Sequence, residues 1–200
     1  AKAERLLKRS LLIREQIRGK NHQIVAESLN NLALLYAAQG HIEKFESLLK
    51  KSLSLSKKNL GENHPIVGTS SKNLANLYLF KKEYDKAESL FRRSLDIMET
   101  AYGRGHFQVA DTLTGLGSLF LAKEEYQQSE NYLNDANNMF ESSLGENHPE
   151  SIKVLNLLAL LHYKKGTYQK SDLLYKKSLA IGNDFLGENH PTVISTLVLY

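Results

Sequence analysis

The sequence contains no cysteine, and only three of its 200 residues are proline. Without cysteine there can be no disulfide framework, no thiol nucleophile and no cysteine-ligated zinc. No run of 18 apolar residues occurs, so the sequence predicts no membrane-spanning helix. A phosphate loop, a dinucleotide fingerprint, an HExxH zinc motif and a nucleophile elbow are all missing. We therefore expect no enzyme activity and no cofactor in this chain, and its lack of thiols fits a cytoplasmic location.

The three prolines all belong to one repeated motif, Gly-Glu-Asn-His-Pro, at residues 61–65, 145–149 and 187–191. Degraded copies occupy residues 19–23 and 103–107, so that both the glycine and the histidine recur every 42 residues. A fixed period of this length indicates an array of stacked helical units, each burying its apolar face on its neighbours. Such an array presents a long surface to partners, which predicts a binding protein.

Residues 61–102 show how one unit is built. Gly61 can take the positive φ that closes a helix, and Pro65 suits the first turn of the next one. His64 then falls at or near the N-cap. The first helix is expected to run to about Lys81, and acidic residues at 83–88 open a second helix.

Three columns of residues recur at the 42-residue step and predict the core. One column is apolar: Leu32, Leu74, Leu116 and Leu158. One is small, which allows close helix approach: Ala33, Ala75, Gly117 and Ala159. One is aromatic, with His162 as a core packing residue: Tyr36, Tyr78, Phe120 and His162. The pattern predicts an α-α hairpin repeated in register.

The pattern Leu32-Ala33-x-x-Tyr36, followed by Gly40 and Leu53, resembles a tetratricopeptide repeat. The 42-residue form with LGENHP and LNNLALLY is similar to the kinesin light chain and nephrocystin type, which is also found as the sensor or scaffold arm of bacterial effector proteins. The resemblance implies an all-α fold, a right-handed α-solenoid of antiparallel helix pairs.

The repeats predict a single array over residues 1–200. Full repeats cover 19–60, 61–102, 103–144 and 145–186, and half repeats cover 1–18 and 187–200. Because repeat arrays ordinarily end in polar capping helices and neither end has one, we expect an excerpt of a longer, multidomain protein.

The resemblance also implies a binding site, because the first helix of each repeat lines a concave groove that holds extended peptides. Asparagine amides can donate and accept hydrogen bonds with a peptide backbone, lysine adds a point charge, and Phe80 and Tyr163 offer apolar contacts. The candidate groove residues are Asn30, Asn31, Lys72, Asn73, Asn76, Phe80, Thr114, Ser118, Lys153, Asn156 and Tyr163. The alternative is that these are ordinary solvated helix residues.

We expect a protein-interaction scaffold or adaptor that binds a peptide segment or partner protein in this groove. The alternative role is a regulatory arm of a larger bacterial effector, such as a caspase-like (CHAT) protease.

Three further sequence features bear on function: basic pairs, a histidine in every repeat, and a glycine inside a helix. Basic pairs at 8–9, 50–51, 92–93 and 176–177 could track phosphates, but 22 acidic residues nearly balance 26 basic ones and no aromatic nucleic-acid motif accompanies them. One histidine per repeat cannot converge on a metal, because packed helices lie about 8–10 Å apart and Zn–N bonds are about 2 Å. Gly115 within a helix predicts either a hinge, a close ligand approach or simple sequence drift.

Overall fold

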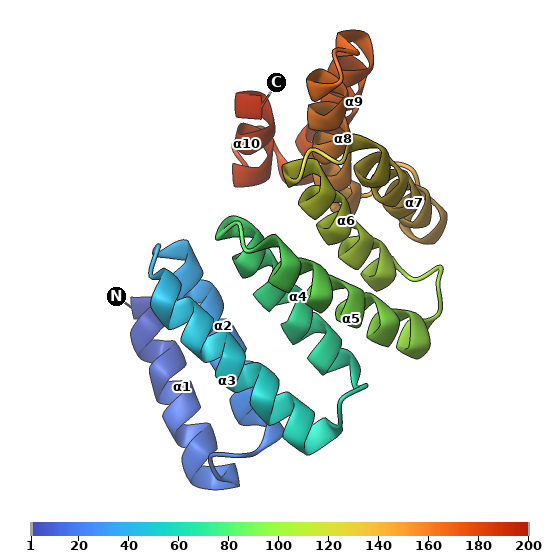
Figure 1. The fold of residues 1–200 in the computed structure, drawn as a ribbon. Coiled ribbons are helices and arrows are strands. Elements are labelled where there is room, and N and C mark those ends of the chain that lie inside the picture. The colour runs from blue at the N-terminus through green and yellow to red at the C-terminus, as the bar shows by residue number, and fades with distance from the viewer. Residues whose placement is uncertain (1, 200) are drawn as a thin grey trace. The chain divides into compact units, whose positions relative to one another are not determined.

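The computed structural model describes the backbone of residues 2–199 and the side chains of residues 2–198. Every regular element in that range is a helix, coloured in chain order in Figure 1. The chain divides into two compact units, residues 1–101 and residues 102–200. Tyr200, where the sequence analysis ends its last half repeat, lies outside the described residues.

The first unit is a series of helices packed in chain order. α1 packs on α2, α2 on α3, and α3 on α4, and side chains of α5 meet Gly68 of α4. The bounds are α1 (Lys2–Arg18), α2 (Gln23–Ala38), α3 (Ile42–Leu60), α4 (Pro65–Phe80) and α5 (Tyr84–Tyr102).

The second unit repeats this plan. α6 packs on α7, α7 on α8, α8 on α9, and α9 on α10. The bounds are α6 (Phe107–Ala122), α7 (Tyr126–Leu144), the 3₁₀ turn η1 (Pro149–Ser151), α8 (Ile152–Lys164), α9 (Tyr168–Leu186) and α10 (Pro191–Leu199).

The helices keep the period of the sequence. α2, α4 and α6 each have 16 residues, and α3, α5, α7 and α9 each have 19. Equivalent helices start 42 residues apart, except that the 3₁₀ turn η1 occupies the first turn of the fourth repeat. The predicted α-α hairpin in register is confirmed.

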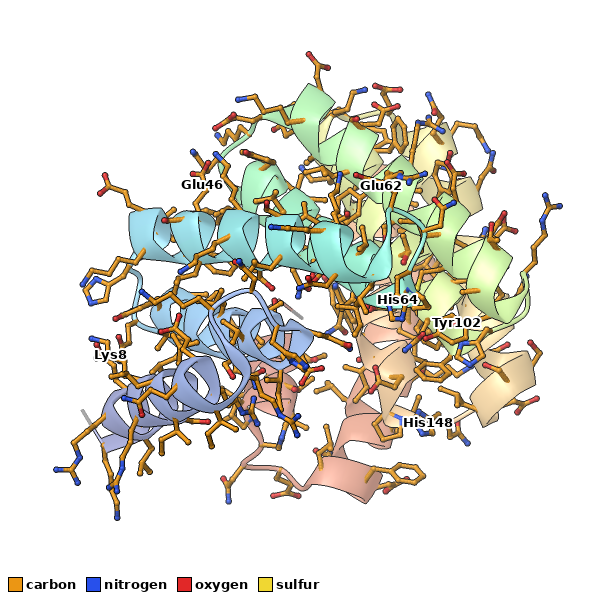
Figure 2. The ribbon with its side chains drawn as sticks, turned by 90° about the horizontal axis from the view of Figure 1, so that it is seen from below. Lys8, Glu46, Glu62, His64, Tyr102 and His148 are labelled. Atoms are coloured by element: carbon orange, nitrogen blue, oxygen red, sulfur yellow. The ribbon has the colours of Figure 1, made fainter. Side chains whose placement is uncertain are left out.

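The histidine column caps helices, as the sequence predicts. In each motif the histidine Nδ1 accepts a hydrogen bond from the backbone N–H two residues later, at 3.2–3.3 Å. His64, in the turn before α4, is labelled in Figure 2. The glycine that begins each motif takes the left-handed conformation, with φ between 82° and 96°. Such a conformation strains any side chain, which explains why glycine recurs there.

The three predicted columns form the core. All members of the apolar, small and aromatic columns are buried, including His162. The small column has a direct steric reason at Gly117, where an added Cβ would lie 2.5 Å from the Leu133 side chain. The first and second helices of a hairpin therefore approach too closely at this point for a larger residue.

Candidate functional site

Two of the candidate asparagines, one on α2 and one on α4 of the first unit, lie within hydrogen-bond distance of each other. The Asn73 side-chain amide donates to the Asn30 carboxamide oxygen at 3.3 Å, although the two residues lie 43 positions apart in sequence. Both side chains are half-buried, and Asn31 beside them is exposed. Because α2 and α4 are the first helices of adjacent repeats, this hydrogen bond connects two successive repeats within the first unit.

A cavity of about 200 Å³ opens beside this pair. Its lining comes from α2, α3 and α4 and includes both asparagines of α2: Ala26, Glu27, Asn30, Asn31, Ser52, Ile66, Thr69 and Ser70. The cavity therefore combines a mainly apolar wall with amide groups at its rim.

The other candidates on α4 spread along the helix. Lys72 and Asn76 are half-buried. Phe80 is 73% exposed at the end of α4, a position where an aromatic ring gains little from the core. The structure thus brings Asn30, Asn31 and Asn73 together, and leaves Phe80 as a separate apolar contact.

In the second unit, Thr114 corrects the sequence expectation. Its side chain is buried in α6, and its hydroxyl donates to the Ala110 carbonyl at 2.8 Å. A buried hydroxyl bonded to its own helix cannot contact a peptide on the surface, so Thr114 does not belong to an exposed groove. Ser118, one turn later, is half-buried.

The Asn156 side chain on α8 forms a hydrogen bond with the neighbouring repeat. Its amide donates to the Thr196 hydroxyl of α10 at 2.7 Å, while its carboxamide oxygen is buried without a hydrogen-bond partner among the described residues. Lys153 is exposed on the preceding turn. The polar face of α8 is therefore used partly for packing rather than for a ligand.

Tyr163 lies in a different place, at the end of α8. Its ring makes an edge contact with Tyr168, with centroids 5.5 Å apart, and both rings are mostly exposed. The two tyrosines border a cleft of about 720 Å³, together with Tyr175, Leu160 and Val198. Tyr163 is thus an apolar contact point of the second unit alone.

Gly115 is buried and helical. α6 continues through it without a break, from Phe107 to Ala122. The hinge, the ligand approach and the drift interpretations stay predictions.

Sequence reasoning missed an acidic clamp that joins successive repeats. On the second helix of one repeat, Glu46 accepts from Lys50 at 2.7 Å, from Lys81 at 2.8 Å and from the Tyr78 hydroxyl at 3.4 Å. Tyr78 and Lys81 belong to the next repeat. Glu46 is labelled in Figure 2, as is Lys8, which lies on α1 before the repeat that contains Glu46.

The clamp recurs in both units. The Tyr36 hydroxyl donates to Glu4 at 2.9 Å, and Lys8 pairs with the same carboxylate at 2.7 Å. In the second unit, Lys165 pairs with Glu130 at 2.5 Å, and His162 stands in the tyrosine column. A glutamate at 42-residue spacing, at positions 4, 46, 88 and 130, was a signal that could have revealed it.

The clamp has a clear electrostatic signature. Hydrogen bonds from Lys50 and Lys81 lower the pKa of Glu46 from 4.5 to about 2. The pKa of Glu4 is lowered by Lys8 and Tyr36, and the pKa of Glu130 by Lys165. An opposite charge within hydrogen-bond distance favours the ionised carboxylate in each case.

The first residue of each basic pair forms an ion pair within its own helix. Lys8, Lys50 and Lys176 each pair with an acidic residue one turn earlier on the same helix, as does Arg92 with Glu88. Among the described residues, no group of three histidine, aspartate or glutamate side chains is placed to hold a metal ion. None of the described helices could cross a bilayer.

Comparisons with known proteins agree with this architecture. The model of the tetratricopeptide repeat family matches four overlapping spans, residues 1–58, 43–100, 70–142 and 108–184. No curated protein sequence matches the chain.

Several solved structures share the fold. BtubC (BKLC) from P. vanneervenii has a TM-score of 0.76 at 22% identity, over 99% of this chain and 78% of that one. A putative kinesin light chain from P. anserina with nearly identical TPR-like repeats has a TM-score of 0.68 at 21% identity, over 92% and 88%. A Rap protein complexed with Competence and Sporulation Factor has a TM-score of 0.77 at 16% identity, over 98% and 57%. This chain therefore spans little more than half of that Rap protein. The expected all-α helical-repeat solenoid is confirmed.

Proposed function

Because this chain belongs to the tetratricopeptide repeat family, with an array of the kinesin-light-chain type, we propose that it is a protein-interaction scaffold. Its ligand is an extended segment of a partner protein, which lies along the exposed face of α2 and α4. The observation that carries the proposal is the Asn30–Asn73 pair beside an apolar cavity on that face.

The chemistry of the pair suits a peptide backbone. A side-chain amide has two N–H donors and an oxygen with two lone pairs. The bond between Asn73 and Asn30 uses one donor of the first and one lone pair of the second. Each amide therefore retains groups of both kinds, and Asn31 lines the same cavity as Asn30.

The cavity supplies the second element of recognition. Ala26 and Ile66 give it an apolar surface, and the remaining lining is polar: Glu27, Asn30, Asn31, Ser52, Thr69 and Ser70. An extended peptide can place one side chain in such a cavity while the amides hold its backbone, which is how grooves combine affinity with specificity. The Rap structure, which holds its protein together with Competence and Sporulation Factor, supports ligand binding on this fold by analogy.

Selection of peptides from a displayed library against the 200-residue chain tests the proposal. The affinity of a selected peptide is then measured by fluorescence anisotropy for the wild type, for Asn30→Ala/Asn73→Ala, and for Lys51→Glu on the exposed face of α3. We expect the double substitution Asn30→Ala/Asn73→Ala to weaken peptide binding at least 10-fold, because about 1.4 kcal/mol of lost hydrogen bonding corresponds to that factor. The lysine variant should bind as the wild type does.

The reverse result, with binding lost in Lys51→Glu and kept in the asparagine variant, would place the ligand on the second helices and refute the proposed site. The role as a regulatory arm of an effector enzyme stays a prediction, as does the cytoplasmic location.

A further inference from the structure

An ion pair in the second repeat joins the turn before α4 to the second helix, α5. The Glu62 carboxylate of the turn, labelled in Figure 2, lies 3.9 Å from the Arg93 guanidinium of α5. Arg93 also donates to the Glu62 carbonyl at 3.1 Å and to the Asn63 side-chain oxygen at 2.8 Å. The turn and the second helix of this repeat are therefore held together by opposite charges.

The first repeat has two like charges at the same two positions. The equivalents of Glu62 and Arg93, 42 residues earlier, are Lys20 and Lys51. The later full repeats all have opposite charges there: Glu62 and Arg93, Arg104 and Asp135, Glu146 and Lys177. The third repeat even exchanges the two signs and keeps the opposition. Among the full repeats, the first alone places two positive charges at these positions.

The backbone of the first repeat places the two lysines as the second repeat places its ion pair. Gly19 and Gly61 begin the two turns with φ of 82° and 87°. The N–H of the histidine three residues later donates to each glycine carbonyl, at 3.2 and 3.4 Å. The two helices that follow have the same lengths in both repeats. Lys20 and Lys51 therefore face one stretch of surface, where their like charges repel.

More positive charge surrounds the two lysines. Both are exposed, and neither pairs with an acidic side chain of the described residues. Arg18 and Lys20 line a cavity of about 480 Å³ with Asn59 of α3, and none of the residues that the structure shows around this cavity is acidic. Lys58, next to Asn59, is exposed two turns after Lys51 on the same face of α3.

The exposure of this surface does not depend on the neighbouring repeat. The second repeat packs on the first through α3 and α4. Even so, the side chains of Arg93 and Glu62 are 40% and 59% exposed. The turn and the outer face of the second helix therefore remain open to a partner within an array.

We propose that the cationic cluster, made of Arg18, Lys20, Lys51 and Lys58, binds an acidic segment of a partner protein. Carboxylates of that segment take the place that Glu62 holds beside Arg93, and they neutralise the repelling lysines from outside. Residues 1–101 have 18 basic and 11 acidic side chains, a net charge of +7, which favours the approach of an acidic chain.

The cationic cluster suits carboxylates better than nucleic acid. It contains no phenylalanine, tyrosine or tryptophan on which a base could stack. Three of its four cations are lysines, whereas the planar fork of arginine is the better match for phosphate. The inference is independent of the peptide site on α2 and α4, because the two sites share no residue.

Fluorescence anisotropy of labelled octaglutamate with the 200-residue chain tests the proposal. We expect saturable binding that disappears near about 1 M salt, where the Debye length is about 3 Å. Lys20→Glu should weaken this binding about 10-fold or more, because it supplies Lys51 with an internal carboxylate. Lys164→Glu is the matched control, since it makes the same change of net charge at an exposed position of the second unit. It should bind octaglutamate as the wild type does.

Stability provides a second measurement. Lys20→Glu restores the opposite charges of the second repeat, so its midpoint of urea denaturation should lie above that of the wild type. Octaglutamate should raise the midpoint of the wild type, because a ligand of the folded state stabilises it, and should leave that of Lys20→Glu unchanged. A lower midpoint for Lys20→Glu would contradict the repulsion between Lys20 and Lys51.

A wild type that shows no saturable binding of octaglutamate overturns the proposal. Equal weakening by Lys20→Glu and Lys164→Glu would also refute it, because net charge alone would then attract the peptide. Tighter binding of an oligothymidylate of the same charge would assign the cationic cluster to nucleic acid instead. Displacement of octaglutamate by a peptide that binds through Asn30 and Asn73 would show one shared site and refute a separate one.

Discussion

The two compact units share one backbone plan and differ in charge. Residues 1–101 contain 18 lysines and arginines against 11 aspartates and glutamates, a net charge of +7. Residues 102–200 contain 8 against 11, a net charge of −3. The buried columns, the capping histidines and the acidic clamp occur in both. Repeat packing therefore fixes a small set of positions and leaves the surface charge free to diverge.

The first helices differ in the same way. α2 offers Asn30 and Asn31 at the rim of a cavity. The equivalent residues of α6 are Thr114 and Gly115, and both are buried. On α8 the equivalent of Asn30 is Asn156, whose amide is bonded to Thr196. We therefore place the peptide site in the first unit, where Asn30 and Asn73 are bonded to each other. Comparing matched substitutions in the two units separates what the fold requires from what a ligand requires.

Truncation of the shared apolar column should produce the largest effect and no difference between units. Leu74 and Leu158 are equivalent and equally buried, each 4% exposed. Leu74→Ala and Leu158→Ala should each lower the free energy of unfolding by about 2–5 kcal/mol, through lost transfer energy and a residual cavity. Urea denaturation measures the loss.

Hydrogen exchange then shows where the loss falls. Leu74→Ala should reduce amide protection chiefly in residues 1–101, and Leu158→Ala chiefly in residues 102–200, because repeat stability is carried by each unit and its neighbours. Uniform loss over the whole chain in both variants would mean that the two units unfold as one cooperative body.

The small column should distinguish the units. An added Cβ at Gly117 meets Leu133 at 2.5 Å, whereas Ala75 already carries a Cβ at the equivalent position. Gly117→Ala should destabilise the chain by about 1–3 kcal/mol through overpacking, despite the gain in helix propensity. Ala75→Gly should cost about 1–2 kcal/mol, because helix propensity is lost together with a buried methyl group. Thermal unfolding of both variants tests this, and a stabilised Gly117→Ala would show that Leu133 can move aside without cost.

The caps should have a smaller effect that is similar in both units. His64 and His148 each accept one backbone N–H at 3.2 Å. Replacement by alanine leaves that donor without its partner, so His64→Ala and His148→Ala should each cost about 1 kcal/mol. Aspartate is a good N-cap, and His64→Asp should restore most of the loss in urea denaturation. An alanine variant as stable as the wild type would show that water replaces the imidazole.

The contribution of the acidic clamp to the free energy of unfolding should decrease at low pH. The folded pKa of Glu46, about 2, lies below its ordinary value of 4.5. The stabilisation it provides is therefore fully present above pH 4.5 and is lost as the pH falls toward 2. Because the carboxylate and both lysines are partly exposed, we expect about 1 kcal/mol. Glu46→Gln should match the wild type near pH 2 and fall below it near pH 7. A gap between the two proteins that persists at pH 2 would contradict the clamp.

The sequence could predict the parts of the fold that depend on a single repeat. The 42-residue step located the turns, the capping histidines and the buried columns, because each of these is set by local backbone chemistry or by the face of one helix. The expectation that Gly117 permits close approach is confirmed by its distance to Leu133.

The candidate site was harder to predict, because it depends on contacts between repeats. The family resemblance implied that Thr114 is a groove residue, but packing buries it. Asn156 is engaged by Thr196, which lies 40 residues away. The acidic clamp was visible as a column of glutamates, but its partners Tyr78 and Lys81 belong to the following repeat. A single-repeat pattern does not show which side chain of the next repeat will face it.

Substitution of His162, the histidine that stands in the tyrosine column, should have the smallest effect on stability. His162 occupies the column of Tyr36 and Tyr78, and burial lowers its pKa, outweighing the opposing charge of Glu130. Lys165 and Lys170 also face it and act in the same direction as burial. Because the folded pKa lies below the unfolded one, the neutral ring stabilises the fold above the ordinary histidine range, and this contribution is lost as the pH falls through the folded value. His162→Tyr should therefore unfold with less pH dependence than the wild type between pH 7 and pH 5. Parallel profiles for wild type and His162→Tyr would mean that the pKa of His162 is the same in the folded and unfolded states, and would contradict this prediction.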